Sequence, residues 1–533
     1  MPPDFSRATL LRRLARQPDW DLIVIGGGAS GLGVALDASG RGYRTLLLER
    51  HDFAKGTSSR STKLVHGGVR YLAQGQLGLV REALLERGRL LRNAPHLVQA
   101  QRFIIPACHR WERPWYGLGL MLYERLAGDL GLGRPRWLSQ AETLRELPGV
   151  RPAGLRGGIS YSDAQFDDAR LAVNLAQTCL ELGALVLNHC GVRAVLHDAR
   201  GQVVGVEAED AETGCRYQLR APAVVNATGI FADDVRRLDQ PAAAPLLRPS
   251  QGVHLVLDAT FLPGAAALMI PRTDDGRVLF AVPWQGSVVL GTTDTPLSAI
   301  SEEPRALPAE VDFILHTAAR YLSRPPRPAD VRCVYAGLRP LAAGGAGQAT
   351  RDLSRRHRVV VSPAGLVSLT GGKWTTFRQM GQDTIDQLIG RGRLPSRPSS
   401  SARQLIHGAL PAAASAPGGA WAAPGSYLAR YGTDQAALAA LIRAEPALAQ
   451  PLVPGLDYRQ AEVVWAARAE LARTVEDVLA RRVRLLFHDA RAALAAAPTV
   501  AALLGRELGH DEGWQQRQLA EFGQLARGYL LET

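Results

Sequence analysis

Apolar and polar residues between positions 21 and 50 are arranged in blocks that predict a strand, a turn, a helix and a second strand. Leu22–Ile25 is a continuous apolar run, the pattern of a strand that is buried on both faces. Three glycines and a stretch of small residues follow, and a second apolar run, Thr45–Leu48, ends at Glu49. The order of these segments is typical of a parallel βαβ unit that binds a dinucleotide.

The three glycines, Gly26, Gly28 and Gly31, have the spacing of a phosphate-binding turn. They permit a tight turn and let backbone N–H groups approach a pyrophosphate at a helix N-terminus, where the helix dipole favours anions. Glu49, about twenty residues downstream, occupies the position at which an acidic side chain binds a ribose 2′-hydroxyl. We therefore predict that these four residues bind the nucleotide half of a cofactor.

The block of residues 51–72 distinguishes FAD from NAD, because it is rich in small hydroxyls and glycines instead of forming another plain strand and helix. Such a loop places many donors along a long cofactor without bulky side chains. For any single serine an ordinary polar loop is an equal alternative, but the block as a whole favours FAD. The residues that we assign to FAD here are Thr57, Ser58, Ser61, Thr62, Lys63, His66, Gly67 and Gly68.

Later segments predict a return to the same domain and then a second sheet. A helix is expected over 167–182, and further strands of the first domain are expected at Leu185–Leu187, Gly205–Glu209, Ala223–Thr228, Val359–Val361 and Leu366–Leu369. The strand that ends in VVNATG carries small residues, so Ala227 and Gly229 let the cofactor pass close to the backbone. Antiparallel strands of the second sheet are expected at Val253–Leu257, Val278–Val282 and Val288–Leu290.

The predicted fold class is α/β, a Rossmann-like FAD-binding domain interleaved with an antiparallel-sheet substrate cap, followed by a C-terminal helical domain. Residues 1–18 form an N-terminal extension, and residues 19–80, 160–240 and 355–390 form the discontinuous FAD-binding domain. Residues 81–159 and 241–354 form the cap. Residues 391–425 are rich in Pro, Ser, Ala and Gly and predict a linker. Helical spacing of apolar residues dominates from 426 to 533.

Composition agrees with a folded protein of two or three domains. The chain has 533 residues, of which 46% are hydrophobic and 21% charged, and no apolar run approaches the ~20 residues that span a bilayer. The N-terminus lacks the apolar core and cleavage site of a secretory signal. The five cysteines are scattered, which indicates reduced thiols in a cytoplasmic protein and offers no metal site.

Lysine is used at only three of the 62 basic positions: Lys55, Lys63 and Lys373. A compact ammonium and a planar guanidinium are not interchangeable in a tight site. Because Lys63 and Lys373 fall inside the two segments that most resemble cofactor-binding loops, we interpret the amine of Lys373 as chemically required.

The net charge of +12 suits a phosphorylated substrate, an anionic membrane or nucleic acid, although much of it is arginine spread over a solvated surface. Residues 101–128 mix arginines and aromatic residues, including Trp111 and Trp115, with the apolar run Leu118–Leu122. This composition suits a segment that lies in the headgroup region of a membrane. A buried hairpin or helix pair inside the cap is an equal alternative.

The chain resembles the FAD-dependent, quinone-linked, membrane-associated glycerol-3-phosphate dehydrogenases. The resemblance is carried by GGGASGLGVALDASGRGYRTLLLER and TSSRSTKLVHGGVRYL in the first domain. It continues through VVNATG, VHLVLD, GTTDTP, GLRPL, ATRD, GGKWTTFRQM and AEVVWAARAELARTVEDVLARRVRLLF, and covers about residues 19–530. It implies FAD as cofactor and hydride transfer from C2 of sn-glycerol 3-phosphate to the flavin, which yields dihydroxyacetone phosphate. The electrons then pass to a membrane quinone.

The resemblance also implies which residues bind the substrate and the flavin. Residues that match the substrate-binding positions of the family are Arg339 in GLRPL, Arg351 in ATRD, Lys373 in GGK, and the pair Arg70 and Tyr71 beside the flavin. His254 in GVHLVLD is the candidate general base, with Lys373 sharing or assisting that role. Gly372 and Thr375, in the same GGKWTT segment as Lys373, are assigned to the cofactor.

The expected partners are sn-glycerol 3-phosphate, a membrane quinone and an anionic membrane surface, with a homodimer among the options and no nucleic acid. The expected location is the cytoplasm, peripheral on the cytoplasmic face of the inner membrane. Two departures from the family pattern are the short glycine-rich loop between Arg339 and Arg351, which leaves the reach of Arg351 open, and Gln251 where some bacterial relatives have lysine.

Two alternative functions remain at this point. An oxidase that passes electrons to O₂ shares nearly every motif, but the extra segment expected of such oxidases is not found. A flavin-containing RNA-binding protein is the remote alternative, because the sequence carries no basic run interleaved with aromatic residues and no recognisable RNA module.

Overall fold

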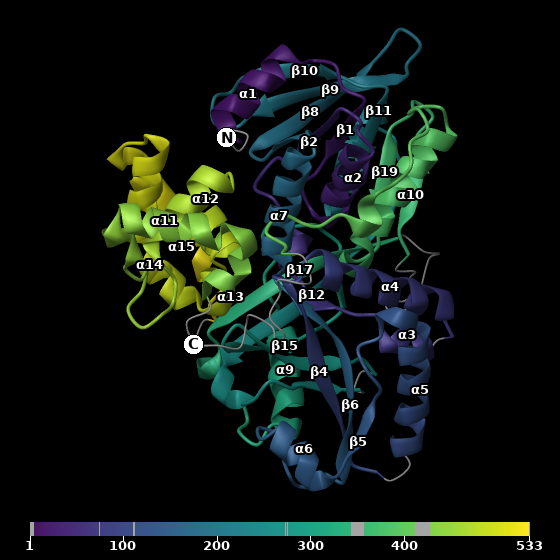
Figure 1. Cartoon of the computed structure of the whole chain (residues 1–533), viewed down its shortest axis with the longest axis vertical. Coiled ribbons are helices and arrows are strands. Elements are labelled where there is room, and N and C mark those ends of the chain that lie inside the picture. Colours follow the sequence, from purple (N-terminus) through teal and green to yellow (C-terminus); the bar gives the residue numbers. More distant parts are fainter. Residues whose placement is uncertain are drawn as a thin grey trace.

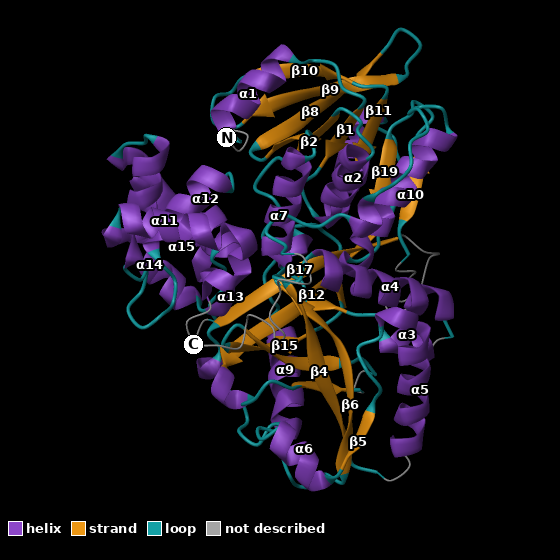
Figure 2. Ribbon diagram, in the orientation of Figure 1, coloured by secondary structure: helices purple, strands orange, loops and turns teal. Residues whose placement is uncertain are grey.

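The computed structural model places two large sheets one above the other, with a helical bundle against their shared boundary (Figures 1 and 2). It describes residues 5–73, 75–109, 112–271, 273, 276–342, 356–410 and 427–531. The N-terminal part of the chain builds the core of the upper sheet, the middle of the chain builds most of the lower sheet, and the C-terminal fifth forms the bundle.

The upper sheet has six strands in the order β18-β19-β11-β1-β2-β7. All neighbours are parallel except β18, which pairs antiparallel at one edge. Their bounds are β1 Leu22–Ile25, β2 Thr45–Leu48, β7 Leu185–Leu187, β11 Ala223–Asn226, β18 Arg358–Val361 and β19 Val367–Thr370. Every residue of β1 and β2 is buried, because helices cover both faces of a parallel sheet. The predicted βαβ unit is therefore confirmed.

Helices of this domain pack closely where glycines allow it. They are α1 Arg7–Arg16, α2 Ala29–Gly40, α7 Asp168–Glu181, α8 Ala232–Asp239 and α10 Phe377–Gly390. Helices α2 and α10 cross at Gly33 and Gly381, where a Cβ on Gly381 would lie 2.1 Å from the carbonyl oxygen of Gly33. Only glycine permits this approach, which brings the N-terminal half of α10 against the N-terminal half of α2. A three-stranded antiparallel sheet flanks the domain, with β8 Cys190–His197, β9 Val203–Asp210 and β10 Arg216–Arg220.

The lower sheet is mostly antiparallel and follows the order β16-β12-β15-β14-β13-β4-β6-β3, with β17 beside β12 and β5 beside β6. Its strands are β3 Leu64–Val65, β4 Val98–Ala107, β5 Arg136–Leu138, β6 Gly157–Phe166, β12 Leu247–Asp258, β13 Ala267–Ile270, β14 Leu279–Trp284, β15 Ser287–Gly291, β16 Thr295–Pro296 and β17 Cys333–Ala342. The short strand β3 belongs to the loop that follows β2, so this loop joins the two sheets.

Helices pack on both faces of the lower sheet. They are α3 Val69–Ala73, α4 Leu77–Asn93, α5 Glu112–Leu126, α6 Gln140–Glu146 and α9 Pro308–Tyr321. Apolar residues of α9 pack with one face of the sheet, while Leu120 of α5 packs with Phe103 and Tyr161 from the other. The predicted antiparallel cap is therefore present, and the fold class is confirmed.

Two expectations about the cap need correction. Residues 157–166 form β6 in the cap sheet, so the chain returns to the upper domain with α7 and not at residue 160. The segment 101–128 is not one unit: 98–107 is strand β4, paired along its whole length with β6, and α5 follows it. Among the described residues of this segment, the exposed large apolar side chains lie on α5.

The C-terminal bundle comprises α11 Gln435–Ala444, α12 Gln460–Ala469, α13 Leu485–His488, α14 Ala490–Leu508 and α15 Glu512–Arg527, with a π-helical turn at Asp477–Arg482. Its apolar core is continuous with the lower sheet, since Phe487 and Tyr529 pack with Tyr335 of β17. Charged residues of the π-helical turn are buried against the upper domain, where Arg481 and Arg482 donate to Asp52 of the loop after β2. The bundle therefore bridges both sheets (Figure 1).

An imidazole ties the upper domain to the start of the bundle and gives a pH-dependent contribution to stability. His407 Nδ1 lies 2.6 Å from Glu181 at the end of α7, and Nε2 lies 2.9 Å from Asp434 before α11. Although burial alone would lower it, the two carboxylates raise the pKa of His407 to about 9. The stabilisation is therefore fully present below pH ~6.5, where His in the unfolded chain is also charged, and it is lost as pH rises through about 9.

We expect thermal unfolding of His407→Ala at pH 7 to begin several degrees below that of the wild type, and the difference to shrink as pH rises to ~10. Differential scanning calorimetry at both pH values measures it. A difference that is the same at pH 7 and pH 10 would contradict the assigned ion pairs.

Candidate active site

Three adjoining cavities run from the upper sheet to the lower sheet. The first has a volume of about 380 Å³, the middle one about 250 Å³ and the end cavity about 170 Å³. The first and middle cavities share Ala29, Ser30, Thr57, Ser58 and Gly229 in their linings. The middle and end cavities share Thr62, Leu64, His66, Tyr71 and Arg339. Together they form one elongated space of the shape that a dinucleotide and a small substrate require.

Glycines at the first cavity lie where side chains would not fit. Gly26 has φ +107°, and a Cβ there would lie 2.8 Å from the carbonyl oxygen of Ala227. A Cβ on Gly31 would lie 1.9 Å from the carbonyl oxygen of Gly26. Gly28 is the N-cap of α2 and lines the cavity. This turn leaves the N-terminus of a buried helix facing the cavity, as a pyrophosphate site needs.

Glu49 stands at the end of β2 and lines the same cavity. Its Oε2 accepts a hydrogen bond of 2.6 Å from the N–H of Gly27, and its Oε1 accepts one of 2.8 Å from the N–H of His51. These bonds hold the carboxylate between the glycine turn and the loop after β2. The position suits a carboxylate that contacts a ribose, with Ala227 and Gly229 on the opposite wall.

Hydroxyl groups of residues 57–62 hold the loop that lines the middle cavity. Thr57 Oγ1 donates to the carbonyl of Leu338 at 2.6 Å, and Ser58 Oγ accepts from the N–H of Ala29 at 2.9 Å. Ser61 lines the cavity and donates to a carboxylate outside it. The loop thus spans from α2 to the lower sheet, and the structure brings all four predicted hydroxyl residues together: Thr57, Ser58, Ser61 and Thr62.

Two residues that the sequence assigned to the cofactor, Lys63 and Gly67, are not among the lining residues of the three cavities. The Lys63 side chain is completely buried, and its ammonium donates to Asp168 Oδ2 and to the carbonyl of Ser59, each at 2.7 Å. It lines none of the three cavities. Gly67 also lies outside the linings, where a Cβ would meet Leu84 and Tyr123. Both therefore have structural positions, whereas His66 and Gly68 line the end cavity.

The segment before α10 forms one wall of the middle cavity. Gly372 has φ +80°, and a Cβ there would lie 2.4 Å from the sulfur of Met380. Lys373 Nζ lies 4.0 Å from the centre of the Tyr71 ring, which places an ammonium and a phenol together at the cavity. Thr375 lines the same wall. The structure therefore brings Lys373 from the third part of the upper domain beside Tyr71 from α3.

His254 lies in β12 on the opposite side of the middle cavity, 2% exposed. Its Nε2 is 2.9 Å from Thr62 Oγ1, while Nδ1 has no hydrogen-bond partner among the described residues. The ring stacks on Tyr335 at 4.8 Å. Burial lowers the pKa of His254 well below 6.5, and the nearby positive charges of Lys63 and Arg339 lower it further. The ring is therefore neutral near pH 7 and able to accept a proton.

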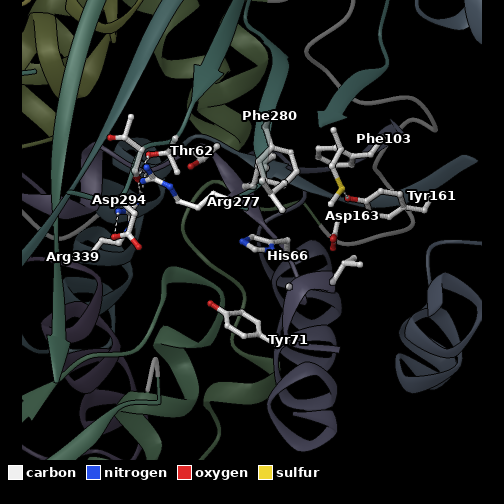
Figure 3. Close-up of a pocket in the computed structure, with 17 residues that line it drawn as sticks. Thr62, His66, Tyr71, Phe103, Tyr161, Asp163, Arg277, Phe280, Asp294 and Arg339 are labelled. Carbon is white, nitrogen blue, oxygen red and sulfur yellow. Dashed lines mark hydrogen bonds and ion pairs between the residues drawn. The ribbon is translucent and has the colours of Figure 1, made fainter. Parts of the chain in front are cut away.

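The end cavity has a polar wall and an apolar wall (Figure 3). Arg339 of β17 belongs to the polar wall: its Nη2 donates to Thr292 Oγ1 at 3.0 Å and to the carbonyl of Thr293 at 2.9 Å, and its Nη1 lies 3.3 Å from Asp294 Oδ1. His66 and Tyr71 point toward the same space. The apolar wall consists of Leu64, Val69, Phe103, Tyr161, Met269, Val278 and Phe280.

Arg277 is a second cation of the end cavity that the sequence analysis missed. It lies just before β14, with its guanidinium 5.3 Å from the centre of the Phe313 ring. Residue type alone does not single it out among 59 arginines, and none of the motifs above contains it. Its only sequence signal is its place directly before a cap strand.

For two other residues that were predicted to bind the substrate, the structure does not describe the side chain. Arg351 lies outside the described residues, and for Arg70 the structure describes the backbone in α3 but not the side chain. Their roles stay predictions.

A buried group of Asp52, His189 and Asp477 has ligand atoms close enough together for a metal ion. However, Asp52 accepts hydrogen bonds from Arg481 and Arg482, and Asp477 accepts one from Arg481. These carboxylates are therefore already paired with guanidinium groups. Asp52, His189 and Asp477 belong to an ion-pair cluster between the upper domain and the bundle.

Comparison with known proteins gives matches over almost the whole chain. A family model described as FAD dependent oxidoreductase matches residues 21–378, and one described as the C-terminal domain of alpha-glycerophosphate oxidase matches residues 414–515. The mitochondrial glycerol-3-phosphate dehydrogenases of Macaca fascicularis and Arabidopsis thaliana are each 38% identical to this chain. These alignments cover 97% and 96% of this chain, and 74% and 87% of the relatives.

Among solved structures, the glycerol-3-phosphate dehydrogenase from Bacillus halodurans, complexed with FAD, is 28% identical and aligns over 99% of both chains with a TM-score of 0.79. The L-alpha-glycerophosphate oxidase from Mycoplasma pneumoniae shares the fold over 72% of this chain, with a TM-score of 0.57 and 18% identity.

The fold and the glycine-lined cavities define a flavoprotein oxidoreductase. Within that class, the chain belongs to the family of FAD-dependent glycerol-3-phosphate dehydrogenases. The resemblance stated from the sequence, and FAD as its cofactor, are therefore confirmed.

Proposed function

We propose that this protein oxidises sn-glycerol 3-phosphate to dihydroxyacetone phosphate with bound FAD and passes the electrons to a membrane quinone. The observation that carries the proposal is a small cavity with two arginines that adjoins the middle cavity, which suits a flavin and is lined by a neutral buried histidine. The glycerol-3-phosphate dehydrogenases among its relatives support the choice of substrate.

Arg339 and Arg277 bind the substrate phosphate in this proposal. A dianion that leaves water needs fixed cations, and guanidinium groups offer paired donors with the geometry of phosphate oxygens. Arg339 is held by Thr292, Thr293 and Asp294, so its direction is set before the substrate arrives. This preorganisation reduces the entropic cost of binding.

FAD, when bound, supplies the hydride acceptor for C2 of the substrate. His254 accepts the proton of the C2 hydroxyl as the carbonyl forms, so that the C–H electron pair leaves as hydride and the O–H electron pair becomes the new C=O bond. Its low pKa keeps the ring neutral before the reaction. Lys373 and Tyr71, in contact at the same cavity, stabilise the developing negative charge on the oxygen.

The activity itself is tested by incubating the purified protein with sn-glycerol 3-phosphate and measuring dihydroxyacetone phosphate. We expect turnover with a soluble quinone analogue and little peroxide with O₂ alone. Equal or faster turnover with O₂ would favour the oxidase alternative. Retained binding of tRNA at ~0.2 M salt, together with no oxidation of the alcohol, would favour the RNA-binding alternative.

The apolar wall of the end cavity supports a quinone as the electron acceptor. Glycerol phosphate is polar over most of its surface and cannot use Phe103, Tyr161, Met269 and Phe280, which are largely buried together there. A planar apolar ring fits such a wall beside the flavin. The acceptor would therefore enter after dihydroxyacetone phosphate has left.

Contact with a membrane is supported by α5, which also packs against this apolar wall. Its Leu118, Met121 and Leu122 are 71%, 55% and 42% exposed and lie on one face of the helix at i, i+3 and i+4. Trp137 of β5, 42% exposed, lies beside Gly117 of the same helix. None of the described helices is both long and apolar enough to cross a bilayer.

We expect the triple variant Leu118→Ser, Met121→Ser, Leu122→Ser to float with anionic vesicles at most one third as well as the wild type. The substitutions remove most of the apolar area that the helix would bury in the membrane. The control Leu405→Ser, Leu410→Ser removes leucines of similar exposure (42% and 40%) outside α5. Equal flotation of both variants would exclude α5 as the anchor.

The cytoplasmic face of the inner membrane remains the proposed location, and a homodimer remains a prediction. Sedimentation of the protein in detergent, with and without the α5 substitutions, measures the oligomeric state separately from membrane binding.

A further inference from the structure

The C-terminal bundle contributes none of the described residues that line the three cavities. The last of these lining residues in the sequence is Met380, which precedes the bundle. Even so, the bundle buries several charged side chains against the loop that lines the middle cavity. Arg484, which precedes α13, donates a hydrogen bond to the carbonyl of Ser59 in this loop. Its side chain is completely buried.

Asp168, the first residue of α7, is the point where this arginine meets the loop. Its Oδ1 accepts a hydrogen bond of 2.7 Å from Arg484 Nη2. Its Oδ2 accepts bonds of 2.7 Å from Lys63 Nζ and 2.6 Å from Ser61 Oγ, as well as one of 3.2 Å from the N–H of Ser61. One carboxylate thus holds three donor groups of the loop and one of the bundle.

Arg484 also binds the loop and its own helix directly. Its Nη2 donates to the carbonyl of Ser59 at 3.1 Å, and its Nη1 donates to the carbonyl of Ala480 at 2.7 Å. Nε lies 3.3 Å from a carboxylate oxygen of Asp167. Two cations, Lys63 and Arg484, are therefore balanced by two aspartates in a space without solvent access. Removing one cation would leave a buried charge uncompensated.

The same turn carries the contact to His254. Thr62 stands between Ser61 and Lys63, the two residues that Asp168 holds, and its hydroxyl is 2.9 Å from His254 Nε2. The hydroxyl of Tyr335 donates to the carbonyl of Ser61 at 3.0 Å, and the Tyr335 ring stacks on His254. The orientation of the imidazole thus depends on the position of residues 61 and 62.

We propose that Arg484 is a positioning residue for the oxidation: through Asp168 it fixes the turn of Ser61 and Thr62, and with it the orientation of His254 and the wall of the flavin cavity. This inference rests on the proposed function. A small displacement of a reacting group lowers the rate steeply. The bundle can therefore affect catalysis through Arg484, although it contributes no residue to the described cavity linings.

The test compares Arg484→Met with Arg170→Met. Arg170 is also completely buried between α7 and the bundle, where it pairs with Glu470 at 2.7 Å, but it does not contact the loop of residues 57–63. Both variants remove one buried arginine from the same interface. Anaerobic stopped-flow absorbance, with excess FAD and saturating sn-glycerol 3-phosphate, gives the limiting rate of flavin reduction.

We expect Arg484→Met to reduce this limiting rate at least ~10-fold, and Arg170→Met to change it less than ~2-fold at a temperature where both are folded. Arg484→Lys, which keeps the cation, should recover most of the loss. Equal limiting rates for the two methionine variants would overturn the proposal. If Arg484→Met does not fold, Arg484→Gln, which keeps a donor toward Asp168, is judged by the same criteria.

The wild-type protein separates this result from a failure of the proposed function. If its flavin is not reduced by sn-glycerol 3-phosphate at all, the proposed function is wrong. If the wild type is reduced and Arg484→Met is reduced equally fast, only the positioning role is wrong.

Discussion

Arg339→Ala is expected to lower kcat/KM for sn-glycerol 3-phosphate about 1000-fold, on the order of 4 kcal/mol of transition-state binding. The loss of this guanidinium removes one of the two cations proposed for the substrate phosphate, and it leaves Asp294 with the hydroxyl of Ser250 but without its cationic partner. Asp294 is only 6% exposed, so water cannot replace the lost charge well. Steady-state kinetics with a quinone analogue measures the effect.

Two variants sharpen this prediction. Arg339→Lys keeps the charge but loses the paired donors, and we expect an intermediate loss of about 30-fold. Arg332→Ala removes another arginine–aspartate pair of the cap, with Asp258, outside the three cavities, and should stay within ~2-fold of the wild type. A loss below ~5-fold for Arg339→Ala would mean that the phosphate binds elsewhere.

His254→Gln is expected to lower the limiting rate of flavin reduction between ~100-fold and ~10,000-fold, the range for loss of a general base. Glutamine can still contact Thr62, so FAD content should remain that of the wild type. His96→Gln is the matched control, because His96 is also buried with a low pKa of about 4 but contacts Asn174 outside the cavities. Equal rates for His254→Gln and wild type would remove His254 from the mechanism and leave the role to Lys373.

The pKa of His254 also predicts the pH dependence of the reaction. The base must be neutral to act, and burial and neighbouring cations keep its pKa well below 6.5. The rate of flavin reduction in wild type should therefore not fall as pH decreases from 8 to 6, and should be lost only at lower pH. A loss centred near pH ~6.5 would indicate a solvated histidine instead.

The first domain was predictable from sequence because its signals are local. The glycine turn, the buried strands and Glu49 follow one another within thirty residues, and each has a direct steric or electrostatic reason. Helix α7 and the strands β7, β9 and β15 also fall within a few residues of their expected places. Such patterns depend on near neighbours, which a sequence displays.

Other features depend on partners far along the chain. Lys63 looked like a cofactor ligand because of its neighbours, yet its ammonium pairs with Asp168, 105 residues away. Segment 101–128 looked like one membrane-surface element because strand β4, paired with β6, and helix α5, partly exposed, are adjacent in sequence. Arg277 has no motif, and only the folded cap sheet brings it beside Arg339. Long-range packing decides each case.

The central claim is that a flavin in these cavities removes a hydride from a phosphorylated alcohol held by Arg339. Its most direct measurement is the visible spectrum of the purified holoprotein, under anaerobic conditions, before and after addition of sn-glycerol 3-phosphate. We predict that the flavin absorbance near ~450 nm bleaches with the phosphorylated substrate and returns when a quinone analogue is added. A protein that does not retain FAD, or whose flavin stays oxidised under these conditions, would contradict the account.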